Sequence, residues 1–170
     1  MENIIYTELY NSPMGPMIIG SYREQICLCE WIAGKEEARD QLTQMMDAKF
    51  VIGSSKVNTE AMRQLDEYFA KKRKMFEVPL FICGTELLQD LWMEISMIPY
   101  GSFATFSKVS MNIGLKKTSR SVGKWVYKNS ICIFIPTHRV ISTRDIENRG
   151  YMGDNSLKRR LLILENTEIR

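Results

Sequence analysis

The sequence predicts an α/β (α+β) protein made of two domains. Residues 1–83 combine alternating apolar segments with one amphipathic helix, whereas residues 84–170 show mainly helical periodicity. Between these two parts, the stretch FEVPLFICGT (residues 76–85) has no helical period and contains Pro79 and Gly84. Because 170 residues are enough for two small domains, we expect an N-terminal α/β domain over 1–83 and a second domain over 84–170.

The first strands are predicted within IIYTELYNSPMGPMIIGSYREQICLCEWI, residues 4–32. Its alternating and continuous apolar runs are typical of strands, and NSPMGP interrupts them with a Pro/Gly turn. Cys27 and Cys29 lie two positions apart in this segment, so they share one face and are expected to be packing residues. A helix is predicted in TEAMRQLDEYFAKKRK, with Thr59 as its N-cap. Its apolar side chains recur at helical spacing, at Met62, Leu65, Tyr68 and Phe69.

The second domain is predicted to begin with a helix over ELLQDLWMEISMI, capped by Thr85. Its expected buried stripe is Leu88, Leu91, Trp92 and Ile95. Two short helices follow, TFSKVSMNIG and LKKTSRSVGKWVYKN, joined around Gly114, and this arrangement predicts a helix-turn-helix. SICIFI is expected to be an extended apolar segment, and SLKRRLLILEN a last helix capped by Ser156.

Charge is unevenly divided between the two halves. Residues 1–83 hold 10 Lys/Arg and 12 Asp/Glu, a net −2, whereas residues 84–170 hold 13 and 8, a net +5. The total of +3 is too small to establish a nucleic-acid partner, but it predicts that a polyanion would dock on the second half.

Several classes of protein are not expected. The four cysteines have neither the spacing of a disulfide framework nor that of a zinc site, and a single histidine excludes a His-rich metal site. No run of about 18 apolar residues predicts a membrane span, and MENIIYTELYNSPMG does not read as a secretion signal. We therefore expect reduced thiols and a cytoplasmic location, associated with the nucleoid if the source is prokaryotic.

Basic residues recur along the second helix of the helix-turn-helix. Lys116, Arg120, Lys124 and Lys128 are spaced by four, so a continuous helix would place them on one face. Such a face in a DNA groove would contact phosphates, and Arg120 could reach between the bases. The small residue Ser121 would allow close approach to the backbone. A solvated basic helix face is the alternative interpretation.

The segment IFIPTHRVIST contains the only histidine, His138, directly after Thr137 and Pro136. A histidine held rigidly in such a turn can take a proton from an adjacent nucleophile, although a lone histidine is more often structural. The neighbour here is a threonine, whose hydroxyl has a very high pKa. A cysteine thiol, with a pKa near 8.5, would react far more readily. The turn therefore has the surroundings of a reactive residue but lacks an effective nucleophile.

Seven segments in register resemble one family, the O6-alkylguanine-DNA alkyltransferases, also called methylated-DNA–protein-cysteine methyltransferases. They are YNSPMGPMIIG, QLDEYFAKKRKMFEVPL, IPYGSFATFSKVSMNIG, SRSVGKWVYKN, IPTHRVI, GYMG and LKRRLLILEN. The resemblance implies a small ribonuclease-H-like N-terminal domain and a mainly helical C-terminal domain with a DNA-binding helix-turn-helix. It also implies a monomer without cofactor or metal, whose partner is double-stranded DNA carrying O6-alkylguanine.

The resemblance assigns roles by position in the family motif Pro-Cys-His-Arg-Val. Thr137 occupies the position of the cysteine that accepts the alkyl group. His138 corresponds to the residue that deprotonates the thiol through a water, and Glu165 to the carboxylate that orients it. Asn129 corresponds to the asparagine that ties the turn. Arg120 corresponds to the arginine that fills the place of the flipped base.

The resemblance also implies a guanine pocket with walls at Tyr151 and Val140 and a lid at Met152. Phe106 replaces a tyrosine whose hydroxyl helps to turn the nucleotide outward in the family. Cys132 borders this pocket but, in an extended strand, would face away from Thr137. The expected DNA-binding set is Arg120, Phe106, Lys116, Lys124, Lys128 and Ser121.

Three functional hypotheses follow. The leading one is a DNA-binding family member that recognises O6-alkylguanine by base flipping but has lost alkyl transfer. It would be similar to the alkyltransferase-like proteins, which flag a lesion for an excision-repair protein. The second is an active suicide methyltransferase that uses Cys132 or Thr137 as acceptor. The third is a scaffold that keeps the fold for a role without DNA.

Overall fold

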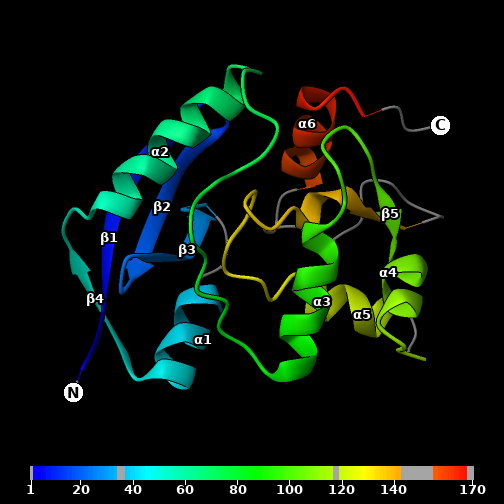
Figure 1. Cartoon of the computed structure of the whole chain (residues 1–170), viewed down its shortest axis with the longest axis horizontal. Helices are drawn as coiled ribbons and strands as arrows, with labels where there is room; N and C mark the ends of the chain where they lie inside the picture. Colours follow the sequence, from blue (N-terminus) through cyan, green and yellow to red (C-terminus); the bar gives the residue numbers. More distant parts are fainter. Residues whose placement is uncertain (1, 34–36, 117–118, 143–154, 168–170) are drawn as a thin grey trace. The chain divides into compact units, whose positions relative to one another are not determined.

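The chain divides into two compact units, Met1–Cys83 and Gly84–Arg170, in the computed structural model (Figure 1). The structure describes residues 2–33, 37–116, 119–142 and 155–167. Each unit combines helices and strands, and the predicted α/β architecture, with a sheet in the first unit and mainly helices in the second, is confirmed. The two units are described separately below.

A four-stranded sheet with the order β3-β2-β1-β4 forms the centre of the N-terminal unit. Its first three strands form an antiparallel meander, and the last strand returns parallel to β1. The predicted Pro/Gly turn joins β1 to β2, with Ser12 opposite Gly15. The strands are β1 (Asn3–Ser12), β2 (Gly15–Tyr22), β3 (Gln25–Trp31) and β4 (Ala48–Ile52).

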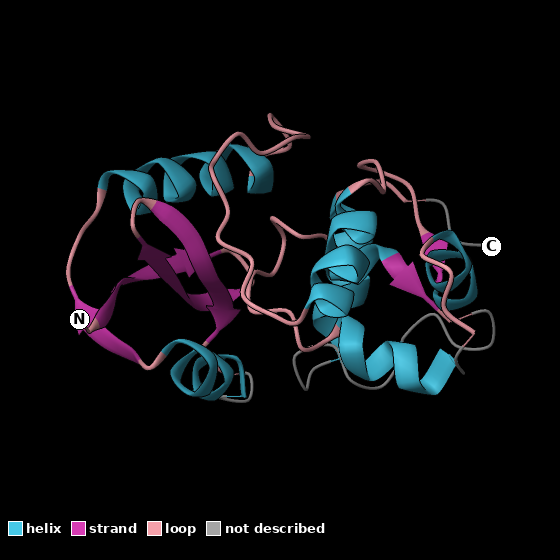
Figure 2. Cartoon of the chain, turned by 60° about the horizontal axis from the view of Figure 1, so that its bottom comes forward, coloured by secondary structure: helices cyan, strands magenta, loops and turns pink. Residues whose placement is uncertain are grey.

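Two helices, α1 (Glu37–Met46) and α2 (Lys56–Phe69), cover this sheet, which lies between them (Figure 2). Leu42 of α1 packs into a core cluster with Ile5 and Leu28 of the strands. Burial of such side chains is the main source of stability for the unit. The helix α1 and the strand β4 are elements that the sequence analysis did not predict. The segment of α1 is mostly polar and that of β4 has only five residues, so both carry little periodic signal.

Cys27 and Cys29 both lie in β3 and are fully buried, which confirms that they are packing residues. The predicted helix over residues 59–74 is also present as α2, but its start is earlier than expected. Ser55, not Thr59, is the N-cap. Its backbone is extended, and its Oγ accepts a hydrogen bond from the Asn58 amide at 3.1 Å. Thr59 lies one turn inside the helix and donates to the Ser55 carbonyl.

The segment after α2 is attached to the edge of the sheet rather than being a loose crossing. The Ile26 amide donates to the Pro79 carbonyl at 2.9 Å, and the Phe81 amide donates to the Ile26 carbonyl at 2.8 Å. Leu80 therefore forms a parallel bridge with Ile26 of β3. These bonds satisfy backbone groups on an otherwise open strand edge.

The C-terminal unit contains α3 (Glu86–Ser96), β5 (Ala104–Thr105), α4 (Phe106–Asn112), α5 (Ser119–Val126), the 3₁₀ turn η1 (Thr137–Arg139), β6 (Val140–Ile141) and α6 (Asn155–Leu164). Thr85 is the N-cap of α3, as predicted, and accepts from the Leu88 amide. Leu91, Trp92 and Ile95 form the buried stripe of this helix, while Leu88 is only half-buried. The Trp92 indole donates to the Trp125 carbonyl at 3.1 Å and so ties α3 to α5.

The predicted helix-turn-helix is formed by α4 and α5, with Gly114 in a left-handed conformation at φ 73° between them. The prediction of one face carrying four basic residues was wrong, however. The helix α5 begins at Ser119 and ends at Val126, so Lys116 precedes it and Lys128 follows it. The helix is shorter than expected because an equal spacing of charges does not fix where a helix starts.

Two further expectations were wrong. SICIFI is not extended, because Ile133 has a positive φ of 70° and the Ile135 amide donates to the Ile131 carbonyl at 3.1 Å. A short apolar run cannot by periodicity be assigned to a strand, and here burial of the whole run stabilises a tight reversal. Ser156 is not the cap of the last helix, since α6 already begins at Asn155.

The helix start of α2 gives a direct test of this structure. Ser55→Ala should lower the free energy of unfolding by about 1 kcal/mol, because the Asn58 amide loses its acceptor. Thr59→Ala is the matched control and should change stability much less, since it removes only an exposed hydroxyl. Urea unfolding followed by circular dichroism measures both. A larger loss for Thr59→Ala would contradict the assigned cap.

Candidate functional site

The turn that contains the only histidine is a single 3₁₀ turn buried in the C-terminal unit. Thr137, His138 and Arg139 are 2%, 0% and 6% exposed. The Arg139 amide donates to the Pro136 carbonyl at 2.9 Å, and the Val140 amide donates to the Thr137 carbonyl. Directly after the turn, β6 pairs in parallel with β5, which fixes its exit direction. The side chains of the turn are therefore held in place by backbone bonds on both sides.

Glu165, directly after α6, accepts from the imidazole of His138, with Nε2 and Oε1 2.8 Å apart. Burial lowers the pKa of His138, and the nearby carboxylate offsets this only in part. Burial by itself raises the pKa of Glu165, but hydrogen bonds and charge from His138 and Arg139 outweigh it and lower this pKa to about 2. The pair at neutral pH is therefore a neutral imidazole and an ionised carboxylate. Because Oε1 can only accept, the imidazole proton lies on Nε2.

Arg139 is a site residue that the sequence analysis did not identify. Its Nε and Nη2 donate to the two oxygens of Glu165 at 2.9 and 2.8 Å, a bidentate pair, and Nη1 donates to the Ile98 carbonyl at 2.7 Å. Such a fork is among the strongest polar contacts in proteins. Arg139 follows Thr137 and His138 and looks like an ordinary turn cation in sequence, so no local pattern indicates its burial.

Asn129 lies at the entrance to the reversal that precedes the turn. Its Oδ1 accepts from the Ile131 amide at 2.6 Å, and the side chain is 5% exposed. The contact orders the backbone where the chain leaves α5 and enters the apolar reversal. The side chain of Asn129 thus stabilises the local backbone conformation.

Lys158 is a second residue that was not identified from sequence. This fully buried ammonium donates to the Val140 carbonyl at 2.6 Å and to the Tyr127 hydroxyl at 2.9 Å. Its Nζ also lies 5.7 Å from the ring centre of Phe106. Lys158 therefore joins α6 to β6, which follows the 3₁₀ turn, and to the residue directly after α5. Within a run of basic residues in a helix, no sequence signal separates it from its exposed neighbours.

Phe106 is a core residue in this structure. It is 3% exposed and packs edge-to-face against Tyr127, with ring centroids 6.1 Å apart. Val140, the expected pocket wall, is fully buried. The other expected pocket residues, Tyr151 and Met152, lie outside the described residues. Contact of Phe106 with DNA remains a prediction.

The expected DNA-binding helix offers one exposed cation with a described side chain. Lys124 is exposed on α5, Ser121 is half-buried, and Val122 and Val126 are buried toward the core. Arg120 belongs to the helix backbone, but its side chain lies outside what the structure describes. The basic surface that was predicted as one long helix face therefore consists of a short helix with Lys116 before it and Lys128 after it.

No cysteine resembles an activated thiol. Burial raises the pKa of Cys27 to about 12, aided by Cys83, and burial also raises the pKa of Cys83. Cys29 is fully buried and Cys132 is 2% exposed. The argument that Cys132 faces away from Thr137 was wrong, because it required an extended strand and the segment turns back on itself, with Cys132 bridging Ile135.

The described residues contain neither a metal-binding cluster nor a membrane-spanning helix. Among them, no three His, Cys, Asp or Glu side chains are grouped so that they could hold a metal ion. Within the same part of the chain, no helix is long and apolar enough to cross a membrane.

The pH dependence of stability tests the state of His138. Because its pKa is lowered by burial, the unfolded chain takes up a proton near pH 6.5 that the folded chain resists. Stability should therefore fall as the pH drops below about 6.5, with a slope of at most about 1.4 kcal/mol per pH unit. The lowered pKa of Glu165 affects stability in a more acidic range. Between about pH 4.5 and pH 2, the stability that this carboxylate contributes is lost as the pH falls.

Urea unfolding between about pH 7.5 and 5.5 measures this slope, and the chain's single histidine makes the assignment direct. In the His138→Gln variant, the unfolding free energy should change little with pH over this range, whatever the effect of the substitution on absolute stability. A wild-type curve that is already flat over this range would contradict a buried neutral imidazole.

Comparison with known proteins places both units in one family. The family model described as 6-O-methylguanine DNA methyltransferase, ribonuclease-like domain, matches residues 5–82. The model described as 6-O-methylguanine DNA methyltransferase, DNA binding domain, matches residues 86–167. The methylated-DNA–protein-cysteine methyltransferase of Methanosarcina acetivorans is 32% identical over 163 residues, covering 96% of this chain and 99% of that protein. The constitutive enzyme of Bacillus subtilis is 31% identical, covering 94% of each chain.

Solved structures agree with this result. The Mycobacterium tuberculosis O6-methylguanine methyltransferase has a TM-score of 0.80 at 28% identity, covering 95% of this chain and 93% of that one. The Mycobacterium tuberculosis OGT in complex with DNA has a TM-score of 0.77 at 28% identity, covering 96% and 92%. With a family match over each unit and relatives aligned over nearly their full length, this chain belongs to the methylated-DNA–protein-cysteine methyltransferase family.

Proposed function

We propose that this chain binds double-stranded DNA, recognises O6-alkylguanine in a flipped-out conformation, and does not accept the alkyl group. The observation that carries the proposal is Thr137, which stands at the cysteine position of the motif Pro-Cys-His-Arg-Val. Membership of the family supports DNA as the partner, as does the complex of a structural neighbour with DNA.

The C-terminal unit supplies the DNA-binding elements in this proposal. In α4 and α5 it has a helix-turn-helix, and Lys124 on α5 is exposed. Lys116 and Lys128 flank the helix and would contact phosphates, while Arg120 would fill the space of the flipped base. Phe106, buried against Tyr127, brings no hydroxyl to the flipped nucleotide. Recognition would therefore depend more on Arg120 and the pocket than on that position.

The chemistry of position 137 argues against transfer. Alkyl transfer requires a nucleophile that attacks the alkyl carbon while the bond to the guanine oxygen breaks, and a thiolate does this well. A neutral imidazole such as His138 can deprotonate a thiol of pKa near 8.5, but an aliphatic hydroxyl lies far outside its range. Thr137 is therefore unable to take the role of the cysteine.

Loss of the reaction does not require loss of the site. His138, Arg139 and Glu165 stabilise one another by direct contacts, none of which involves the side chain at position 137. A protein with this site intact would hold the lesion without repairing it. It would then act by presenting the lesion to a further protein, and an excision-repair protein fits that need.

Cys132 gives a second candidate function, an active suicide methyltransferase. It lies in the buried reversal that leads into the turn, bridging Ile135, two residues before Thr137. Its side chain is nearly inaccessible, with 2% of the residue exposed. Peptide mapping after exposure to methylated DNA distinguishes this candidate, because the methyl group would then be found on the peptide that contains Cys132.

Lesion binding can be measured with duplexes that differ only in one guanine. The chain should bind a duplex containing O6-methylguanine more tightly than its unmodified twin, and its intact mass should not increase by a methyl group afterwards. Fluorescence anisotropy and mass spectrometry report the two results. Equal affinity for both duplexes would overturn lesion recognition, and a mass gain would overturn the loss of transfer.

Arg120→Glu/Lys124→Glu is the control for the DNA-binding helix. Reversing both charges on α5 should weaken binding to both duplexes. If the reversal leaves DNA binding unchanged, the helix-turn-helix is not the DNA-binding element. If wild-type binding is absent, the helix-turn-helix interpretation also fails and a role without DNA is favoured.

Restoring the thiol tests whether only the nucleophile is missing. Thr137→Cys should gain one methyl group from the lesion duplex, because His138 and Glu165 already have the arrangement that activates a thiol. Thr137→Ser is the matched control and should stay unmethylated. If Thr137→Cys remains inert while binding the lesion, the pocket is also incompetent, and Phe106→Tyr in the same background tests the most evident departure.

A further inference from the structure

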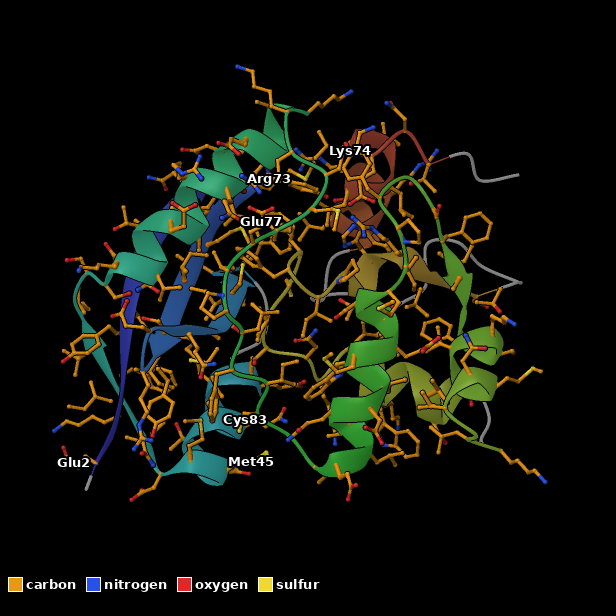
Figure 3. All side chains as sticks on the ribbon, viewed as in Figure 1. Glu2, Met45, Arg73, Lys74, Glu77 and Cys83 are labelled. Carbon is orange, nitrogen blue, oxygen red and sulfur yellow. The ribbon has the colours of Figure 1, made fainter. Side chains whose placement is uncertain are left out.

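A compact basic turn ends α2 in the N-terminal unit. Four consecutive cations, Lys71 to Lys74, follow Ala70 directly, and we call this segment the basic turn. Lys71, Lys72 and Lys74 are exposed, and Arg73 is half-buried. Figure 3 shows Arg73 and Lys74 where the chain leaves the helix. The family's DNA-binding unit does not include this segment, since that family match begins at residue 86.

The basic turn has a defined backbone conformation. Lys71 is left-handed, with φ 60°, and its amide donates to the Tyr68 carbonyl at 3.0 Å. The Lys72 amide donates to the Glu67 carbonyl at 2.8 Å, which closes the end of the helix. Arg73 adds a bond from Nη1 to the Met75 carbonyl at 2.9 Å. The lysines are therefore presented from an ordered helix end and need little further ordering to bind a ligand.

The acidic groups of the same helix already have partners: Asp66 accepts from the Tyr10 hydroxyl, and the two glutamates accept from arginines. Glu67 accepts from Arg63 and, at 2.6 Å, from Nε of Arg73. Glu60 accepts from Arg63 at 2.5 Å. Among the described residues, the structure shows no acidic partner for Lys71 or Lys72. Their charge is therefore not neutralised within the unit and is available to an anion outside it.

We propose that the basic turn is a second phosphate-contacting surface for the DNA duplex that the C-terminal unit binds. This inference rests on the proposed function and adds to it a contact from the N-terminal unit. Regularly spaced phosphates complement a cluster of lysines without requiring a pocket. Lys74 lies ten residues before Gly84, where the second unit begins. A chain of that length spans at most about 36 Å, close to one turn of duplex at about 34 Å.

Duplex DNA fits this surface better than a membrane does. A membrane-surface helix would need a free apolar face beside its cations. The apolar side of α2 is already occupied, with Ala61, Leu65 and Tyr68 fully buried, while its outer side carries the Glu60–Arg63–Glu67 ion pairs. Weak phosphate contacts also gain from tethering, because DNA held by the second unit is present at high effective concentration.

The test compares salt dependence of DNA binding for full-length variants. Lys71→Asn/Lys72→Gln removes two charges, and asparagine tolerates the left-handed conformation at position 71. Each phosphate contact contributes about 0.9 to the slope of log affinity against log salt, so the slope should become shallower by roughly 1.8. Lys72→Gln alone, which leaves the left-handed position unchanged, should give about half of this. Binding should weaken equally for methylated and unmodified duplexes, because phosphates carry no sequence information.

Arg23→Gln/Lys49→Gln is the matched control, since it removes the same charge from exposed positions elsewhere in the N-terminal unit. Its slope should equal that of the wild type. A wild-type slope in Lys71→Asn/Lys72→Gln, with binding retained, would overturn this inference and leave the proposed function standing. If the wild type binds neither duplex, both fall. If the variant loses binding only to phosphatidylserine vesicles and not to DNA, the surface is a membrane contact and the inference is wrong.

Discussion

One carboxylate, that of Glu165, holds the 3₁₀ turn η1 together. It accepts from His138 and from Nε and Nη2 of Arg139, and it lies directly after α6, far along the chain from the turn. The Arg139 guanidinium in turn reaches the Ile98 carbonyl just after α3. One buried ion pair thus joins three separate segments of the C-terminal unit. Breaking a buried pair of this kind leaves an unpaired charge, at a cost of about 3–5 kcal/mol.

The same carboxylate sets the chemical state of its neighbours. An ionised Glu165 fixes the proton of His138 on Nε2, while burial keeps the ring neutral. Lys158 of α6 donates to the Val140 carbonyl, directly after the turn. The turn is therefore fastened at its start by its own backbone, in its middle by Glu165 and at its end by Lys158. The resulting geometry does not depend on which side chain occupies position 137.

Sequence patterns were sufficient where periodicity or local capping determines structure. The β1–β2 hairpin, α2, α3 with Thr85 as cap and the pair α4 and α5 all follow from such signals. Sequence patterns failed where burial across the fold determines the structure. The SICIFI run forms a reversal, and Lys158 and Arg139 look like ordinary surface cations in sequence, yet both are buried by contacts across the fold. The pairing of His138 with Glu165 came from resemblance, since no local pattern links residues so far apart.

This distribution of contacts makes family membership compatible with the proposed loss of alkyl transfer. Glu165, His138 and Arg139 are required by the fold, because removing any one leaves buried polar groups unsatisfied. Position 137 contributes to the fold only through its backbone bonds in the turn, which a threonine makes as well as a cysteine. Mutual stabilisation by these contacts is therefore sufficient reason for the three residues to occur together. In the proposed function, alkyl transfer would require a thiol, and Thr137 has none.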